Sequence, residues 1–387
     1  MKKIVIFGST GSIGTSLIDI IKKDKKNFKI ELISANKNYK KLIKQAKYFN
    51  VKNLIITDPN SFIKAKKILK KENINIFDNF NSFKKIFKNK KIDYTMSAIT
   101  GFEGLKPTLD IIKFTKIIAI ANKESIICGW NLIKKKLEKY RTTFIPVDSE
   151  HFSIWSLINK DKFEKFEKIY LTASGGPFRT YPLSGFKNIS TQQALRHPNW
   201  SMGKKITIDS ATMMNKVFEI IEAKKIFNLK YNQLKILIHP HSYLHAIVKF
   251  NNGLTKMLIH DTSMTIPIFN SLYQKNIKSI KSNTLNIEIL NNLELKPVDK
   301  KRFPVINIID KLTDKCSLFE TVIVSANDIL VNKFLKNEIK FIDISKNLLK
   351  ITSLNEFKKL KNIKPKNVDD IVKLANYVGL KIKTIRV

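Results

Sequence analysis

Short apolar runs alternate with amphipathic segments over roughly the first 147 residues of the chain. Each run is apolar throughout, which is typical of strands whose two faces are both covered by helices. Alternation of this kind predicts a parallel, doubly wound α/β sheet. The predicted strands are Ile4–Phe7, Ile30–Ser34, Leu54–Thr57, Tyr94–Ser97 and Ile117–Ala121, and the predicted helices are Ile13–Lys23, Tyr39–Phe49 and Ser61–Glu72.

The pattern changes at about residue 148. Glycine-containing loops are mixed there with apolar strands and with one long helix predicted over Ser210–Phe227, which indicates a central α+β catalytic domain over residues 148–272. Residues 273–304 are rich in Asn and Lys, show little periodicity and are predicted to be a linker. Helical periodicity then predicts a small C-terminal helical bundle over residues 305–387, after a first domain of residues 1–147. The predicted strands of the central domain are Ile169–Thr172, Ile236–Ile238 and Ala246–Phe250, and the C-terminal helices are Ile306–Leu312, Ser317–Lys336, Ile342–Ile351 and Val368–Val378.

Charge is the most unusual property of the composition. The 387 residues include 71 Lys and Arg against 32 Asp and Glu, which gives a formal net charge of +39. The excess is almost all Lys and is spread along the chain, whereas proteins that read phosphates and base edges favour the bidentate Arg. We therefore expect a solvated basic surface and no nucleic-acid partner. A Lys-rich polyanion-binding protein remains the alternative.

Several features predict a cytoplasmic protein. Two cysteines, Cys128 and Cys316, cannot build a disulfide framework, which suits a reducing compartment. The apolar run that follows Met1 ends at Gly8, too early for a signal peptide. No apolar run approaches the roughly 18 residues that a membrane span requires, so no membrane partner is expected.

The segment from Gly8 to Gly14 lies between the first predicted strand and the first predicted helix. Glycines there let the backbone approach a pyrophosphate, and the helix offers free N–H groups and the positive end of its dipole. The segment therefore predicts a Rossmann-like dinucleotide site. Its spacing is G-x-x-G-x-x-G instead of the commoner G-x-G-x-x-G, and a tight turn without a ligand is the alternative.

The end of the second predicted strand distinguishes between the two nicotinamide cofactors. An acid at this position would bind the ribose hydroxyls of NAD and repel a 2′-phosphate. The chain has Asn36-Lys37-Asn38 instead, with no acid and one cation, which favours NADP. An ordinary surface lysine is the alternative interpretation of Lys37.

Carboxylates in the central domain indicate a metal site. Asp148 and Glu150 are two residues apart at the end of the extended run 142–147, so both side chains are expected on the same side. Oxygen ligands of this kind suit Mg²⁺ or Mn²⁺. Glu219, on the long predicted helix, is a third candidate. The alternatives are a solvated Asp148/Glu150 pair, an ordinary surface pair of Lys216 and Glu219, and a capping role for Asp209 or Ser210.

Two further loops contain candidate substrate residues. Ser174-Gly175-Gly176-Pro177 follows a predicted strand and offers a hydroxyl and backbone N–H groups to an anion, although a plain turn has the same composition. His197 and Trp200 lie on a loop that ends at Gly203, which fits a lid over a site. A packed loop aromatic is the alternative for Trp200. The histidines at 239, 241 and 245 do not have a zinc-site spacing.

The motifs in this order resemble those of the 1-deoxy-D-xylulose 5-phosphate reductoisomerase family. The segments that carry the resemblance are 147–151, 174–179, 196–203 and 209–216, and the similarity extends over essentially the whole chain. It implies a homodimeric enzyme of the non-mevalonate isoprenoid pathway. Such an enzyme converts 1-deoxy-D-xylulose 5-phosphate to 2-C-methyl-D-erythritol 4-phosphate by a metal-assisted skeletal rearrangement and hydride transfer from NADPH.

The resemblance also implies roles for individual residues. The cofactor residues would be Thr10, Gly11, Ser12, Ile13, Asn36, Lys37, Asn38, Asn122, Glu124 and Gly203. The metal ligands would be Asp148, Glu150 and Glu219. The substrate residues would be Lys123, Ser149, Glu150, Ser174, His197, Trp200, Ser210, Asn215, Lys216, Glu219 and Met264, and the catalytic residues Lys123, Asp148, Glu150, Glu219 and His197.

The chain also departs from the family pattern at several positions. Asn36 and Val217 stand where the family has glycine, the segment 261–267 lacks an Asp and an Arg, and Asp328 replaces a Glu. None of these changes removes a proposed ligand. The alternative enzyme is another NADP-dependent aldehyde or semialdehyde dehydrogenase, which would leave the carboxylate trio without a purpose.

Overall fold

The computed structural model describes residues 1–88, 90–158, 166–274 and 278–384. The chain forms two compact units. The first unit contains Met1–Ser125, Leu132–Asp148 and Met264–Ile280, and the second contains Ile126–Asn131, Ser149–Ser263 and Lys281–Val387. None of the described helices is both long enough and apolar enough to cross a membrane. The division into a first domain, a central domain, a linker and a helical bundle stays a prediction.

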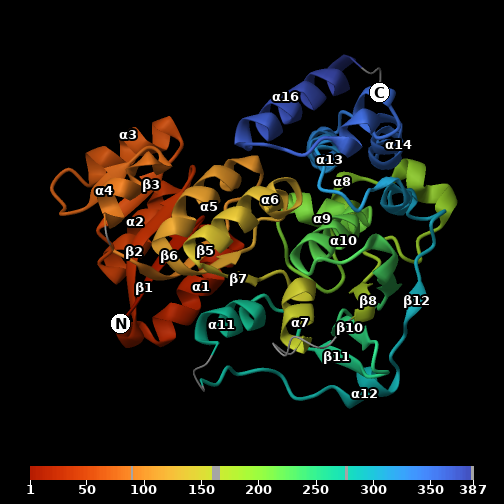
Figure 1. The fold of residues 1–387 in the computed structure, drawn as a ribbon, viewed down its shortest axis with the longest axis horizontal. Coiled ribbons are helices and arrows are strands. Elements are labelled where there is room, and N and C mark those ends of the chain that lie inside the picture. Colours follow the sequence, from red (N-terminus) through yellow and green to blue (C-terminus); the bar gives the residue numbers. More distant parts are fainter. Residues whose placement is uncertain (89, 159–165, 275–277, 385–387) are drawn as a thin grey trace. The chain divides into compact units, whose positions relative to one another are not determined.

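A seven-stranded sheet forms the centre of the first unit (Figure 1). All its strand pairs are parallel, and Ile4 on β1 lies between Ile30 on β2 and Tyr94 on β5. The strand order β4-β3-β2-β1-β5-β6-β7 places the topological switch point between β1 and β5. The predicted doubly wound sheet is confirmed. Its strands are β1 (Lys2–Phe7), β2 (Phe28–Ala35), β3 (Asn53–Ile56), β4 (Asn75–Phe77), β5 (Ile92–Ser97), β6 (Thr115–Ile120) and β7 (Thr143–Pro146).

Helices pack on this sheet because each has one apolar face. In α1, Leu17, Ile20 and Ile21 are buried at helical spacing. The helix α11 comes more than a hundred residues after the other helices of the first unit. It contributes Ile268 and Leu272 to the same core. The helices are α1 (Ser12–Lys23), α2 (Tyr39–Phe49), α3 (Pro59–Ile68), α4 (Phe83–Phe87), α5 (Leu105–Ile111), α6 (Lys123–Tyr140) and α11 (Thr265–Tyr273), with 3-10 turns η1 (Lys25–Asn27), η2 (Phe80–Ser82), η3 (Phe102–Gly104) and η4 (Ile112–Phe114). Within α6, Ile126–Asn131 belongs to the second unit.

Two polar contacts fix α11 within the first unit. The hydroxyls of Tyr94 and Ser271 are 2.7 Å apart in a buried position, and Tyr273 donates to Asp24 Oδ2 at 2.7 Å. A buried hydroxyl needs a partner, so these pairs specify where the helix docks. Residues 264–280 therefore belong to the first unit although they are distant in sequence.

The second unit contains a mixed five-stranded sheet of order β11-β10-β8-β9-β12. Only β8 and β9 are parallel to each other. One face of the sheet packs on Ile154 of α7 and Ile220 of α10. Its strands are β8 (Phe166–Ala173), β9 (Leu234–Ile238), β10 (Leu244–Phe250), β11 (Thr255–Ile259) and β12 (Lys296–Pro297), the last of which lies within the segment predicted as linker.

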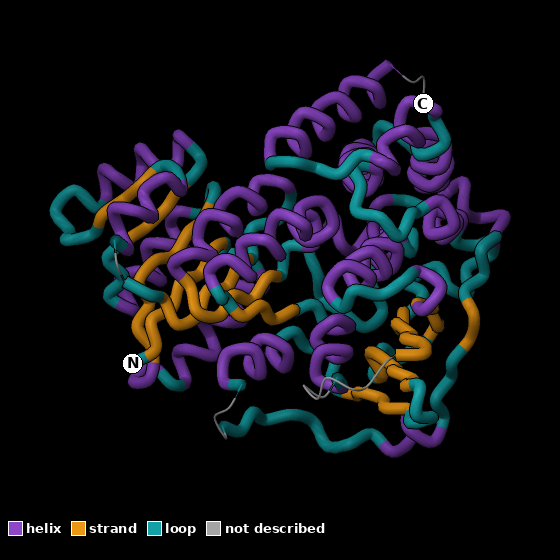
Figure 2. Tube along the Cα trace, viewed as in Figure 1, coloured by secondary structure: helices purple, strands orange, loops and turns teal. Residues whose placement is uncertain are grey.

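Helices make up the rest of the second unit (Figure 2). They are α7 (Ser149–Leu157), α8 (Thr191–Ala194), α9 (Lys204–Ala211), α10 (Met214–Ile226), α12 (Ile287–Asn291), α13 (Phe319–Leu335), α14 (Phe341–Ile351), α15 (Asn355–Lys358) and α16 (Val368–Thr384), with 3-10 turns η5 (Leu183–Asn188), η6 (Tyr231–Gln233), η7 (Pro304–Lys311) and η8 (Lys359–Asn362). The predicted C-terminal helices are therefore present, except that the segment predicted as the helix Ile306–Leu312 is the 3-10 turn η7.

The long helix predicted over residues 210–227 is wrong, because the chain breaks it in two. α9 ends at Ala211, and Met213 has a left-handed backbone with φ 68° before α10 begins. The hydroxyl of Thr212 donates to the carbonyl of Ile208 at 3.1 Å and accepts from the N–H of Met214 at 3.3 Å, which satisfies backbone groups at the break. Asp209 and Ser210 lie inside α9, so the capping role considered for them is also wrong.

Candidate active site

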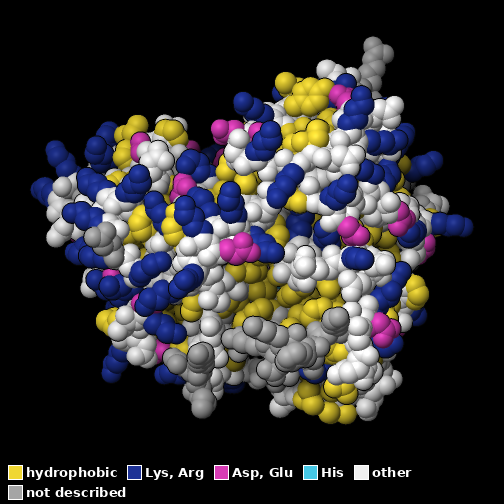
Figure 3. Space-filling model, viewed as in Figure 1, with side chains coloured by type: hydrophobic (Ala, Val, Ile, Leu, Met, Phe, Trp, Pro, Cys, Tyr) yellow, Lys and Arg dark blue, Asp and Glu magenta, His cyan; other side chains and the backbone are white. Residues whose placement is uncertain are grey.

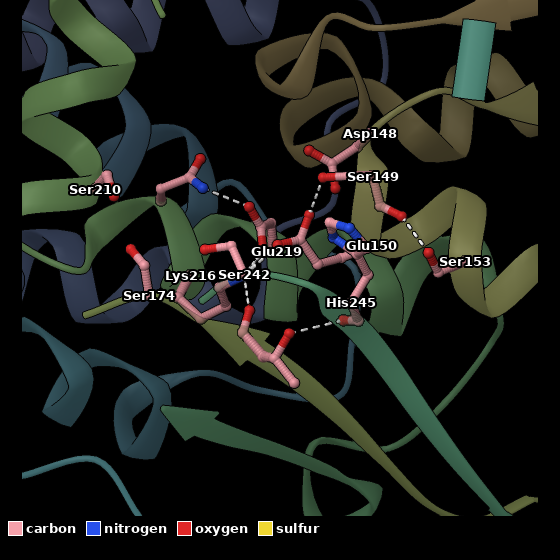
Figure 4. Close-up of polar contacts among 12 residues, drawn as sticks. Asp148, Ser149, Glu150, Ser153, Ser174, Ser210, Lys216, Glu219, Ser242 and His245 are labelled. Carbon is pink, nitrogen blue, oxygen red and sulfur yellow. Dashed lines mark hydrogen bonds and ion pairs between the residues drawn. The ribbon is translucent and has the colours of Figure 1, made fainter. Parts of the chain in front are cut away.

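Three carboxylates converge where α7 and α10 meet (Figure 4). One oxygen from each of Asp148, Glu150 and Glu219 lies within 4.8 Å of the other two. Asp148 follows β7 and is bonded directly to Ser149, the first residue of α7, while Glu150 lies in the first turn of that helix. The predicted reason for their proximity is therefore wrong, because the chain turns into a helix after Asp148 instead of remaining extended.

A buried lysine lies among these carboxylates. Lys216 is 4% exposed, and its Nζ is 2.8 Å from Glu150 Oε1 and also contacts Glu219 Oε2 and the carbonyl of Thr172. Burial opposes the ammonium charge, but the carboxylates of Glu150 and Glu219 outweigh burial and raise the pKa of Lys216. The alternative of an ordinary Lys216/Glu219 surface pair is wrong, since Glu219 is only 1% exposed.

The other residues next to the trio are polar and bound to it. Lys123, in the first turn of α6, forms an ion pair with Asp148 Oδ2. Asn215 donates its amide to Glu219 Oε1, and Ser149 donates its hydroxyl to Glu150. The carboxylates are therefore compensated by ammonium groups and oriented by short polar side chains.

A second polar group is formed by Ser174, His197 and Ser210. His197 Nε2 lies 3.0 Å from Ser210 Oγ and 3.3 Å from Ser174 Oγ. The three come from the end of β8, the loop after α8 and the last turn of α9, so residues far apart in sequence meet at one imidazole nitrogen. Two residues before Ser174, the carbonyl of Thr172 accepts from Lys216, which links this group to the carboxylates.

Hydrogen bonds from backbone N–H groups fix the tautomer of His197. Its Nδ1 accepts the N–H groups of Asn199 at 3.2 Å and Trp200 at 3.0 Å, so Nδ1 carries no proton. The proton therefore resides on Nε2, which faces the two serine hydroxyls as a donor. Burial lowers the pKa of His197 to about 4, so the ring is neutral at physiological pH.

Two glycines bring Ser174 close to Ser210. Gly175 and Gly176 have φ of 81° and 64°, a left-handed conformation that favours glycine. A Cβ on Gly176 would lie 3.0 Å from the carbonyl oxygen of Ser210, so the turn packs directly on α9. This close approach explains the Gly-Gly pair better than a plain turn does.

The loop with Trp200 is attached on one side to the turn between β9 and β10. Asn199 donates to the carbonyl of Pro240 at 2.6 Å and to the hydroxyl of Ser242 at 2.9 Å. The ring of Trp200 meets the ring of His245 edge-on, with centroids 6.2 Å apart. Trp200 itself is half-buried. The loop is therefore held at its base while the indole keeps an exposed side.

His245 belongs to a stacked pair of imidazoles. Its ring is 3.7 Å from the ring of His260, and its Nε2 lies 3.1 Å from the carbonyl oxygen of His260. Burial lowers the pKa of His245 to about 3, with a further contribution from His260, and burial also lowers the pKa of His260. The pair therefore forms a neutral wall behind Trp200.

The glycine-rich turn lies at the carboxyl end of β1, in the first unit. Gly8 has φ 70° and a Cβ on Gly14 would lie 2.3 Å from the carbonyl oxygen of Gly8, so the turn folds tightly against the start of α1. No side chain caps α1 and its first turn contains no acid. Thr10, Gly11, Ser12 and Ile13 thus surround a helix N-terminus whose N–H groups are available to an anion.

The residues after β2 are exposed and carry no acid. Asn36 donates to Thr57 Oγ1 at 2.9 Å, and Asn38 caps α2 by accepting the N–H of Lys41 at 3.2 Å. Lys37 is exposed, and its charge is one of the smaller influences that lower the pKa of Asp58. The prediction that this segment binds the 2′-phosphate of NADP therefore depends on Lys37.

The remaining predicted residues occupy separate positions. Asn122 caps α6 and also donates to the carbonyl of Gly101 at 2.8 Å, so both ends of its amide are used by the fold. Glu124 is buried in the first turn of α6. Gly203 is the residue before α9 in the second unit, and Met264 precedes α11 in the first.

Two buried residues of this region received no predicted role. His151 Nε2 lies 2.9 Å from the carbonyl of Glu219, and its Nδ1 is 3.9 Å from Glu222 Oε2. Together with Asp148 they form a second group whose ligand atoms lie within 4.8 Å of one another. The spacing of Lys216, Glu219 and Glu222 at three-residue intervals could have indicated a single charged helix face.

Basic side chains are scattered over the visible surface, with acidic side chains among them (Figure 3). They do not form one continuous stripe in this view. That distribution fits the expectation of a solvated basic surface.

Comparison with known proteins agrees with the geometry. Three family models match: "1-deoxy-D-xylulose 5-phosphate reductoisomerase" over residues 4–129, "1-deoxy-D-xylulose 5-phosphate reductoisomerase C-terminal domain" over residues 144–227, and "DXP reductoisomerase C-terminal domain" over residues 260–378.

Relatives resemble the chain over most or all of its length. A 1-deoxy-D-xylulose 5-phosphate reductoisomerase of Pelagibacter ubique is 68% identical over 388 residues and is covered completely, as is this chain. One from Clostridium kluyveri is 37% identical, with 89% of this chain and 90% of the relative covered.

Solved structures give the same result. The enzyme from Zymomonas mobilis in complex with NADPH has a TM-score of 0.86 and 30% identity, covering 98% of this chain and 97% of its own. A DOX-P reductoisomerase in complex with NADPH, fosmidomycin and magnesium has a TM-score of 0.88 and 27% identity, covering 99% and 100%. The chain therefore belongs to the 1-deoxy-D-xylulose 5-phosphate reductoisomerase family.

Proposed function

We propose that this chain converts 1-deoxy-D-xylulose 5-phosphate to 2-C-methyl-D-erythritol 4-phosphate with NADPH and a divalent cation, Mg²⁺ or Mn²⁺. The observation that carries the proposal is the convergence of Asp148, Glu150 and Glu219, linked through Lys216 and Thr172 to the Ser174–His197–Ser210 group. A simple aldehyde dehydrogenase would use neither group.

The residues fit a hard divalent cation. Asp148, Glu150 and Glu219 each offer one oxygen within 4.8 Å of the others, and oxygen ligands are those that Mg²⁺ and Mn²⁺ prefer. Two ammonium groups, Lys123 and Lys216, contact these same carboxylates, which supports the proposal that the carboxylates hold positive charge. A bound cation would supply Lewis-acid polarisation of the substrate oxygens.

The first unit fits NADPH. The turn around Gly8 would accept the pyrophosphate on the uncapped N-terminus of α1, and Lys37 would pair with the 2′-phosphate. The chemistry supplied by this cofactor is hydride transfer to the rearranged aldehyde. Lys41 braces the turn, since its Nζ donates to Thr15 Oγ1 at 2.7 Å and to the carbonyl of Thr10 at 3.2 Å.

Ser174, His197 and Ser210 would bind the phosphate of the substrate. The hydroxyl groups of Ser174 and Ser210 both lie within 3.3 Å of His197 Nε2, and each of the three groups can donate to a phosphate oxygen. His197 donates as a neutral ring, because burial lowers its pKa to about 4. Asn215 and Lys216 both contact Glu219 in this structure, and we propose that they also bind the substrate.

Trp200 would exclude water from the bound sugar. Its indole packs on the neutral His245–His260 wall, and its loop is anchored through Asn199. Removing water strengthens the electrostatic interactions of the carboxylates and lysines with the reacting oxygens. Without a bound cation Lys216 Nζ carries its proton, because the carboxylates of Glu150 and Glu219 outweigh its burial and raise its pKa.

The cellular setting is also a proposal. We infer that the chain acts in the cytoplasm as a homodimer, as the family resemblance implies. Neither Cys128 nor Cys316 forms a disulfide within the described residues, which is compatible with a reducing compartment. Sedimentation analysis that finds a monomer at working concentrations would contradict the homodimer.

One assay tests the reaction. NADPH oxidation should require 1-deoxy-D-xylulose 5-phosphate and should stop when a chelator is added. Asp148→Asn and Glu219→Gln should abolish turnover while NADPH binding stays nearly unchanged. Glu167→Gln is the matched control, because Glu167 forms an exposed pair with Lys249 in the unit that contains Glu219. Chelator-resistant reduction of a simple semialdehyde would instead favour the dehydrogenase alternative.

A further inference from the structure

The first unit has a pocket of about 350 Å³ at the edge of the sheet opposite to the glycine-rich turn. Its lining includes Lys91 just before β5, Phe114 just before β6, and Tyr140 shortly before β7. These positions mark the amino ends of three neighbouring parallel strands. The turn at Gly8 follows the carboxyl end of β1, so the two features lie at opposite edges of one sheet.

We propose that this pocket binds a small organic polyphosphate of the nucleoside di- or triphosphate class. Its lining consists of five lysines and two aromatic rings, with no acidic side chain. The lysines are Lys84, Lys88, Lys90, Lys91 and Lys113. A triphosphate, with a charge of about −4 at neutral pH, would compensate most of the positive charge that these side chains bring together.

The charges of the pocket are uncompensated within the described part of the chain. None of its five lysines forms an ion pair there with a carboxylate. Lysines just outside the pocket do find acids: Lys116 pairs with Asp93 at 2.8 Å and Lys106 with Asp110 at 2.8 Å. The pocket therefore concentrates unpaired cations beside neighbours that are paired, and an anionic ligand would relieve their mutual repulsion.

The aromatic rings give the pocket a floor. Phe114 is 8% exposed and packs on Phe87, with ring centroids 5.6 Å apart. Lys113 Nζ lies 4.7 Å from the centre of the Phe114 ring, and Lys91 Nζ donates to the carbonyl of Lys113 at 3.0 Å, which ties the two sides together. Tyr140 is half-buried. Rings beside cations are the combination on which nucleobases stack while their phosphates meet ammonium groups.

The volume agrees with this class of ligand. Small-molecule pockets range over about 300–1,000 Å³, so the pocket is at the lower end, large enough for a base or a polyphosphate chain with part of the ligand in solvent. The high lysine content of the whole chain offers a competing explanation, a diffuse basic field. The experiment must therefore separate a local site from general charge.

Binding of ATP and of inorganic tripolyphosphate to the full chain is measured by calorimetry at about 150 mM salt, where exposed charges are largely screened. Saturating NADPH occupies the glycine-rich turn and EDTA removes divalent ions from the carboxylates. We expect one saturable ATP site, with ATP binding at least threefold more tightly than tripolyphosphate. Competition between NADPH and ATP, or equal affinity for the two probes, would overturn the proposal.

Variants locate the site. Lys84→Gln combined with Lys113→Gln should weaken ATP binding at least tenfold, and Tyr140→Leu should weaken ATP more than tripolyphosphate. The control combines Lys67→Gln with Lys70→Gln, two exposed lysines near α3 in the same unit, which removes the same charge. Equal losses in the two double variants, or equally tight binding of a DNA duplex, would show a diffuse field instead of a pocket. All variants should keep the NADPH-dependent turnover of the parent chain when no ATP is added.

Discussion

Replacing Lys216 by Met tests whether the carboxylate group is built to hold a cation. Lys216 is buried, and its Nζ contacts Glu150 and Glu219. The methionine side chain has a similar length but no charge. The substitution therefore leaves the buried Glu219 and the partly buried Glu150 without this ammonium partner and changes little in shape.

The magnitude follows from the burial of the pair. Removing one partner of a buried ion pair costs about 3–5 kcal/mol, because the other charge stays desolvated. For a folding unit of roughly 150–250 residues, each kcal/mol lowers the melting temperature by about 2–4 °C. We therefore expect Lys216→Met to lower the melting temperature by roughly 6–20 °C in the presence of a chelator.

Magnesium should reverse much of this loss. A cation bound by Asp148, Glu150 and Glu219 supplies the charge that the lysine supplied, and a ligand at 100 times its Kd stabilises a fold by about 2.7 kcal/mol. The parent chain should gain less, since Lys216 competes with the ion for the same oxygens. The measurement is thermal unfolding with a chelator and with excess Mg²⁺, which requires no activity.

Lys225→Met is the matched control. Lys225 lies on the same helix, is 9% exposed and pairs with Glu320 at 3.2 Å, so its removal should also destabilise the fold. Magnesium should not rescue it beyond the gain of the parent chain. If Mg²⁺ stabilises Lys216→Met no more than the parent chain, or rescues both variants equally, the cation-site reasoning is refuted.

Three further predictions concern other parts of the chain. His197 should stay neutral through pH 6–8, because its folded pKa of about 4 is below the unfolded value of 6.5. The stability that its neutral ring contributes is therefore complete above pH 6.5 and is lost as the pH falls toward 4. An NMR titration of the ring with a midpoint near 6.5 would contradict this prediction. Gly176→Ala should cost about 1–2 kcal/mol of backbone strain and should also raise the KM for the sugar phosphate severalfold, because its Cβ would press on Ser210. Gly253→Ala is the control, since Gly253 also has a positive φ but has open space around it and should show the strain alone. An unchanged KM in Gly176→Ala would disprove the contact argument. Lys37→Glu should reduce the preference for NADPH over NADH by roughly tenfold or more, since a charge-assisted contact contributes about 1.5–3 kcal/mol. The ratio of kcat/KM for the two cofactors measures this preference, and Lys40→Glu is the control. An equal effect of both substitutions would argue against a contact between Lys37 and the 2′-phosphate.

The local hydrophobic pattern was sufficient to predict those strands and helices that depend mainly on their own residues. The strands β1, β2, β3, β5 and β6 were predicted because they are apolar throughout, and α2 was predicted with its observed bounds. The short strands β4, β11 and β12 were missed. β12 is only two residues long and exists through its pairing with β9, so its own sequence contains no strand pattern.

The interruption between α9 and α10 shows the limit of periodicity. Apolar positions continue at helical spacing through residues 210–227, but Met213 takes a left-handed conformation that no spacing reveals. That break places Ser210 at the end of one helix and Lys216 at the start of the next. The burial of Lys216 and Glu219, which looked like a surface pair, depends on the elements that cover α10.

The sequence by itself determined the parallel sheet, the glycine-rich turn at Gly8 and the absence of an acid after β2, because each depends on residue type and near neighbours along the chain. It also indicated Asp148, Glu150 and Glu219 as candidate ligands, but their convergence depends on how α7 and α10 pack. Only the tertiary structure decided that Ser174, His197 and Ser210 meet at one nitrogen, that His197 keeps its proton on Nε2, and that Lys216 lies among the carboxylates. Long-range packing sets burial and hydrogen-bond partners, and these fix protonation and charge. A list of residue types cannot contain that information.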